Sequence, residues 1–106
     1  MRLVTIILTI IILSSSIRAE KLTVYTYDSF VSEWGPGPIV EKVFEDKHEI
    51  DLEFVAVDSA ATLLNKIILE GENTKADIVL GLDMNLFNAA EKSDLFIPHN
   101  VKNINN

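Results

Sequence analysis

The sequence contains no cysteine, and this absence excludes several kinds of chemistry. Without thiols, its 106 residues offer no disulfides, no thiolate nucleophile and no cysteine-based zinc site, and His48 and His99 are the only imidazoles. Both histidines sit among polar neighbours, a context typical of solvated surface residues. HExxH, nucleophile-elbow and phosphate-binding glycine motifs are absent as well, so a carboxylate-dependent hydrolase is a weak hypothesis.

Basic residues are also scarce. Lysine and arginine total 9 against 16 acidic residues, which gives a formal net charge of −7. Nucleic acid is excluded as a partner, because phosphate binding needs a clustered excess of basic side chains. Since 48% of the residues are hydrophobic, the chain is nevertheless apolar enough to fold as one domain.

The long apolar run lies at the amino terminus. Residues 1–19 place Arg2 before apolar residues 3–13 and end in small and polar residues at Ala19. This layout predicts a secretory signal peptide cleaved after Ala19, with residues 20–106 as the mature segment. An uncleaved anchor is the alternative, because Ile17 is bulkier than signal peptidases prefer. The apolar run, however, covers only about half of a hydrocarbon core roughly 30 Å thick.

Strand and helix signals alternate along the rest of the chain. Alternating β-branched and aromatic residues predict a strand at 22–27, followed by a loop at 28–38. Alternation of side chains between two faces predicts a second strand at 51–57, and a short apolar run predicts a third at 76–82. Helical spacing predicts helices from Pro38 to about residue 46 and over 85–92 with Leu86, Phe87 and Ala90 inward. A further helix is predicted after the capping candidates Asp58 and Ser59, and Gly71 ends it. This order predicts an α/β fold with a parallel sheet and flanking helices. The asparagine-rich residues 99–106 read as an unpacked tail or as the start of a further element.

Each predicted strand ends beside an acidic residue. Ligands of open parallel sheets gather at the carboxyl ends of the strands, where three acids would favour a cation or a donor-rich ligand. Alternatively, each acid caps the helix that follows it. A divalent metal held by these acids is conceivable, although their spacing does not require one. The acids are Asp28, Asp58 and Asp83.

Several strings resemble one protein family in both order and spacing. TYDSF, WGPGP and KADIVLGLD are similar to strings of the periplasmic thiamine-binding proteins, and the resemblance runs from about Leu22 to Phe96. These are receptors of ABC thiamine importers among the type II extracellular solute-binding proteins. The resemblance implies a two-lobed, monomeric, non-enzymatic protein without cofactor or catalytic residues. It would capture thiamine or its phosphates in the periplasm and deliver them to a permease in the inner membrane.

The resemblance also implies ligand-binding residues. Ser59 and Ala60 occupy a two-residue segment that contacts the ligand in the family, where Asp-Gly is frequent. Ser59 offers a hydroxyl and Ala60 a backbone N–H at the helix start, whereas the carboxylate that could pair with a cationic ligand is lost. Tyr27 would pack on the ligand, although ordinary core packing explains it equally well. The lesser candidates are Trp34, Asp28 and Asp83.

Family chains are roughly three times as long as this one. Residues 20–106 would therefore form only the amino-terminal part of the first lobe. The alternative is a truncated remnant that binds nothing.

Overall fold

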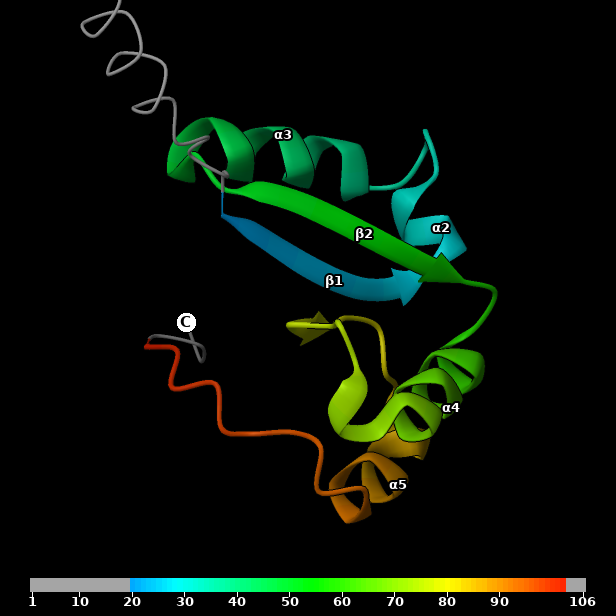
Figure 1. Ribbon diagram of the computed structural model, residues 1–106. Helices are drawn as coiled ribbons and strands as arrows, with labels where there is room; N and C mark the ends of the chain where they lie inside the picture. The colour runs from blue at the N-terminus through cyan, green and yellow to red at the C-terminus, as the bar shows by residue number, and fades with distance from the viewer. Residues whose placement is uncertain (1–19, 103–106) are drawn as a thin grey trace, which may run out of the picture.

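A three-stranded parallel sheet organises the fold in the computed structural model, which describes residues 20–102 (Figure 1). The strands are β1 (Lys21–Tyr27), β2 (Asp51–Val57) and β3 (Ile78–Val79), in the order β2-β1-β3. The predicted parallel α/β architecture is therefore confirmed. The predicted signal peptide, residues 1–19, and residues 103–106 of the tail lie outside the described residues.

Helices cover both faces of the sheet. On one face lie α2 (Asp28–Val31) and α3 (Gly37–His48), and on the other lies α4 (Ala60–Glu70), followed by the 3₁₀ turn η1 (Gly71–Asn73). A second 3₁₀ turn, η2 (Met84–Leu86), leads into α5 (Phe87–Lys92). The two faces follow from strand alternation, because successive side chains of a strand point to opposite sides. Phe54 of β2 meets Phe30 of α2, whereas Tyr25 of β1 meets α4.

The core lies between β1 and α4. Tyr25, Leu63 and Ile67 are buried together, and Val55 and Val57 of β2 pack against them. Leu63 and Ile67 lie one helical turn apart, so the spacing that predicted α4 also selects its buried face. The hydroxyl of the buried Tyr25 donates a hydrogen bond to the Glu70 carboxylate at 3.1 Å.

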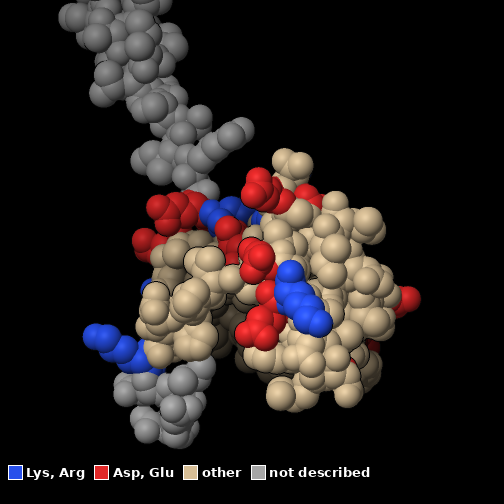
Figure 2. Space-filling model, turned by 90° about the horizontal axis from the view of Figure 1, so that it is seen from below, with Lys and Arg blue, Asp and Glu red and all other residues tan. Residues whose placement is uncertain are grey.

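Two predicted apolar stripes are not buried by the described residues. Ile39 and Val43 of α3 are 70% and 59% exposed, and Phe87 of α5, predicted to point inward, is 55% exposed. The α3 surface that meets β2 instead includes Glu45, whose carboxylate binds the strand backbone. Seen from below, the side of α4 and α5 has broad uncharged areas between scattered charged groups (Figure 2). Within residues 20–102, no helix is both long and apolar enough to span a bilayer.

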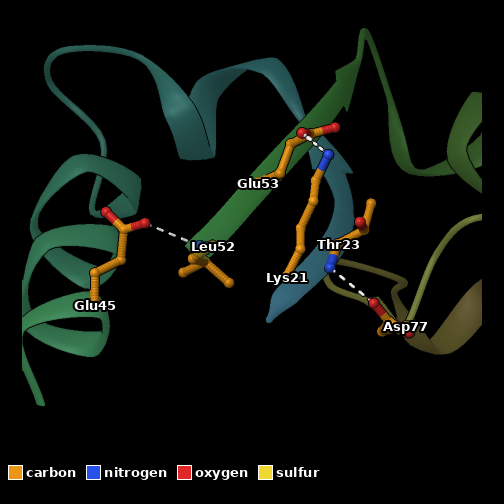
Figure 3. A network of polar contacts seen from close by, with 6 residues as sticks. All are labelled: Lys21, Thr23, Glu45, Leu52, Glu53 and Asp77. Carbon is orange, nitrogen blue, oxygen red and sulfur yellow. Dashed lines mark hydrogen bonds and ion pairs between the residues drawn. The ribbon is translucent and has the colours of Figure 1, made fainter. Parts of the chain in front are cut away.

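Strand β3 is shorter than predicted because a side chain replaces part of its ladder. Instead of a further strand residue, the Asp77 carboxylate accepts a hydrogen bond from the Thr23 N–H at 2.8 Å, while the Asp77 N–H donates to the Thr23 carbonyl at 2.8 Å (Figure 3). Beyond β3, the Leu80 N–H donates to the Tyr25 carbonyl at 2.9 Å. Gly81, at φ 107°, then turns the chain away from the sheet.

Two side chains make polar contacts with β2. The Glu45 carboxylate accepts a hydrogen bond from the Leu52 N–H at 2.9 Å, on the edge of β2 that does not face β1 (Figure 3). Lys21 of β1 pairs with Glu53 of β2, and the hydrogen bond from its ammonium group to Glu53 raises the pKa of Lys21 above its ordinary value. The Glu45 carboxylate thus occupies one backbone N–H group on the free edge of β2.

Candidate functional site

The carboxyl ends of β1 and β2 lie side by side. Tyr27 and Val57, the last residues of the two strands, are partners in the sheet register. Asp28 and Asp58 follow them and are both exposed, so two of the three predicted acids do meet at one edge. This is the edge at which parallel α/β sheets bind their ligands.

The Tyr27 ring is held by two neighbours. The Phe30 ring meets it edge-on, with centroids 6.2 Å apart, and Phe30 in turn packs on Phe54 at 5.6 Å. From another side the backbone of Gly81 lies against the ring, so close that a Cβ there would overlap it. Tyr27 is nevertheless only half-buried, so it packs like a core residue and still presents part of its ring to solvent.

Contact with Tyr27 brings a third segment to this edge. Gly81 touches the ring, and Asp83 lies two residues further along the chain. The Asp83 carboxylate accepts a hydrogen bond from the Asn85 N–H at 2.9 Å and caps η2, so its capping interpretation is confirmed. Because β3 ends at Val79, Asp83 does not follow the strand directly, contrary to prediction.

Ser59, and not Asp58, caps α4. The Ser59 hydroxyl accepts a hydrogen bond from the Thr62 N–H at 3.2 Å and lies 3.0 Å from the Thr62 hydroxyl. Only the residue immediately before the helix, in extended conformation, reaches this N–H group. Of the two predicted capping residues, Ser59 is therefore confirmed and Asp58 is wrong. Ala60 begins the helix, and N–H groups of a first turn have no partner within their own helix.

Asp28 and Trp34 are the remaining predicted site residues, and neither has a side-chain capping role or close packing. Asp28 is the first residue of α2; the cap position belongs to Tyr27, which makes no side-chain capping bond, so Asp28 does not act as an N-cap. Its carboxylate still lies in the first turn, where negative charge is favoured. Trp34 lies between α2 and α3 with 90% of its surface exposed, so it packs little against the described residues.

Two residues that position Tyr27 were missed by sequence reasoning. Phe30 stands three residues after Tyr27, a spacing that can face the same way on a turn of helix, but the predicted loop at 28–38 concealed it. Gly81 follows the third strand, where a glycine signals close backbone approach. Between residues 20 and 102, no three acidic or imidazole side chains gather closely enough to hold a metal ion.

A parallel sheet with helices on both faces agrees with the type II periplasmic binding-protein fold, and a structural comparison supports this assignment. A solved periplasmic thiamin binding protein superimposes on 81% of this chain, with a TM-score of 0.76 and 51% identity, and the match covers 27% of that protein. The predicted fold class is thereby confirmed.

Sequence comparison identifies the relatives. The chain is 54% identical over 80 residues to the thiamine-binding periplasmic protein of Escherichia coli (strain K12), a match covering 76% of this chain and 24% of that protein. It is 49% identical over 83 residues to the protein of the same name from Haemophilus influenzae, of which it covers 25%. No family model matches the chain. The resemblance carried by TYDSF, WGPGP and KADIVLGLD is confirmed: the homologues are thiamine-binding periplasmic proteins, and the chain spans about a quarter of their length.

Proposed function

We propose that the chain is a solute-binding component of a thiamine importer. In this proposal it captures thiamine, or its phosphates, outside the cytoplasm and passes it to an ABC permease, as a monomer and without catalysis or a cofactor. The observation that carries the proposal is 54% identity to a thiamine-binding periplasmic protein, joined to a TM-score of 0.76 with a solved relative.

The chemistry of the strand ends suits such a ligand. Thiamine carries a cationic thiazolium ring and an aromatic pyrimidine, and the partly exposed Tyr27 ring can stack on either. Exposed Asp28 and Asp58 lie at the same edge and give it a negative potential that attracts a cation. The N–H groups of the first α4 turn, beginning at Ala60, suit a phosphate on the same ligand.

The proposed cellular location is based on the relatives and on the amino-terminal sequence. The relatives are periplasmic proteins. Residues 1–19 have the layout of a secretory signal, so we propose export with cleavage after Ala19. Amino-terminal sequencing of the exported protein tests the cleavage site, and a first residue other than Glu20 would contradict it.

A chimera tests thiamine binding. In the E. coli relative, the 80 matched residues are exchanged for the corresponding residues of this chain, and thiamine is titrated in by calorimetry. We expect saturable binding, and we expect Tyr27→Ala to weaken it roughly three- to tenfold because a stacked ring is lost.

Two controls accompany the chimera. Tyr27→Phe keeps the ring and isolates the role of the phenol, and Ile39→Ala, on the exposed face of α3, should leave the affinity unchanged. A folded chimera that releases no heat with thiamine would refute the proposed function.

A further inference from the structure

Residues 32–37, the α2–α3 connection, lie directly on the backbone of α2. A Cβ added at Gly35 would overlap the carbonyl oxygens of Ser29 and Phe30. One added at Gly37, which is buried, would lie 2.7 Å from the Phe30 oxygen. The backbones of α2 and of the connection therefore pack together with no side chain between them, an approach that glycine permits.

Space, and not φ, requires glycine at these two positions. Of the four glycines in the chain, all of which the structure describes, Gly71 and Gly81 have positive φ. The φ values of Gly35 and Gly37 do not exclude alanine, so the contact with α2 alone excludes it. Alanine at either position would push the connection and α2 apart.

Hydrogen bonds also hold the connection against α2. Ser32 donates from its N–H to the Asp28 carbonyl at 3.1 Å and from its hydroxyl to the Ser29 carbonyl at 3.0 Å. The Gly35 N–H donates in turn to the Ser32 carbonyl at 2.9 Å. A single helical turn of four residues has little stability by itself, so these contacts determine where Phe30 stands.

Phe30 joins this contact to the candidate site. Its ring meets Tyr27 edge-on, with centroids 6.2 Å apart, and packs on Phe54 at 5.6 Å. We infer that Gly35 and Gly37 are positioning residues: because they lack side chains, the connection rests on α2 and holds Phe30 against Tyr27. The consequence for thiamine rests on the proposed function, whereas the positioning of the ring does not.

Tyrosine NMR tests the positioning without a ligand. The chain has two tyrosines, Tyr27 at the site and Tyr25 in the core against α4. In the full chain with labelled tyrosine rings, we expect Gly35→Ala to shift the signals of Tyr27 and leave those of Tyr25 unchanged, because the displaced Phe30 ring contacts Tyr27. Gly37→Ala should shift the same signals by less, since its Cβ overlaps α2 less.

Calorimetry on the chimera described above tests the consequence for binding. Gly35→Ala should weaken thiamine binding roughly three- to tenfold, the range expected for Tyr27→Ala, because the ring no longer stands where it stacks. Pro38→Ala, at an exposed residue just after the connection, should leave the affinity within about twofold.

Gly71→Ala is the control for destabilisation alone. It strains a backbone with φ of 55° but introduces a Cβ that meets no atom within 4 Å, so it should cost stability without weakening thiamine binding. Circular dichroism establishes that each variant is folded. If Gly35→Ala is not, Phe30→Leu takes its place: it removes the ring, crowds no backbone, and should produce the same shift and the same loss of affinity.

Three results would overturn the inference: unchanged Tyr27 signals in the folded variant, unchanged affinity despite shifted signals, or an equal loss of affinity with Gly71→Ala. An unmodified chimera that releases no heat with thiamine would refute the proposed function instead. In that case the Tyr27 signals alone decide whether the two glycines position the ring.

Discussion

Gly81 restricts the position of Tyr27, a residue of the candidate site. Its backbone lies on the Tyr27 ring, and its φ of 107° belongs to a region that side chains other than glycine rarely adopt. A second glycine, Gly71, also has positive φ, 55°, but an added Cβ there would meet no atom within 4 Å. The two positions therefore separate backbone strain from contact with Tyr27.

We expect Gly81→Ala to destabilise the fold more than Gly71→Ala does. Each substitution introduces backbone strain of roughly 1–3 kcal/mol, and only the first also displaces the Tyr27 ring. Urea unfolding gives the two free energies, and the NMR signals of the Tyr27 ring report its displacement.

A double-mutant cycle supplies the check on this interpretation. Combining Gly81→Ala with Tyr27→Ala should recover part of the lost stability, because the overlapping ring is gone. If both glycine variants lose the same free energy of unfolding and the Tyr27 signals are unchanged, the contact between Gly81 and Tyr27 does not contribute to stability.

Helix α4 was the element most completely predicted from sequence. Its apolar spacing, its start after Ser59 and its end at Gly71 all agree with the structure, because cap, periodicity and terminating glycine point to the same helix. The only error concerns Asp58, since two adjacent residues of capping type compete and composition does not choose between them.

We expect Ser59→Ala to lower the free energy of unfolding by about 1 kcal/mol, because the Thr62 N–H loses its partner. Ser59→Asp restores an acceptor at the cap and should retain most of the stability. Thermal and urea unfolding measure both changes.

Asp58→Ala is the matched control, because Asp58 precedes the capping position. Its stability should equal that of the unmodified chain. A loss as large as that of Ser59→Ala would mean that Asp58, and not Ser59, caps the helix in solution.

The other elements could be predicted from the sequence to different extents. Both β1 and β2 were predicted well, because alternation and β-branched residues agree with their burial. Local patterns could not show that the Asp77 carboxylate would replace part of β3, since its partner Thr23 is 54 residues away. The single turn α2 is too short to produce a periodic signal.

In the candidate site, the meeting of Tyr27, Asp28 and Asp58 was predictable from topology, whereas the support from Phe30 and Gly81 was not.

At the scale of the whole molecule, net charge opposes contact between exposed apolar surfaces. The formal charge is −7 at pH 7, and the isoelectric point is about 4.6. As the pH falls toward that value, the repulsion between chains disappears while Met84, Phe87 and Ile97 remain exposed.

We therefore expect light scattering by the purified chain to rise steeply near its isoelectric point. Phe87→Asn should reduce the rise because it removes exposed apolar surface, and Asn88→Ser should not. Circular dichroism at each pH distinguishes association of folded chains from unfolding. An equal rise in scattering for the Phe87→Asn variant would show that the apolar surface at Phe87 does not mediate association.

The central place of β1 also sets an order for folding during synthesis. This strand leaves the ribosome first, yet each of its partners lies later in the chain: β2 begins at Asp51 and β3 at Ile78. No ladder of the sheet can form until about half of the chain has been made, and the buried Tyr25 must wait for α4 as well. Such non-local pairing slows folding. A nascent chain that remains extended for this long is available to chaperones and to a translocation channel before its sheet closes.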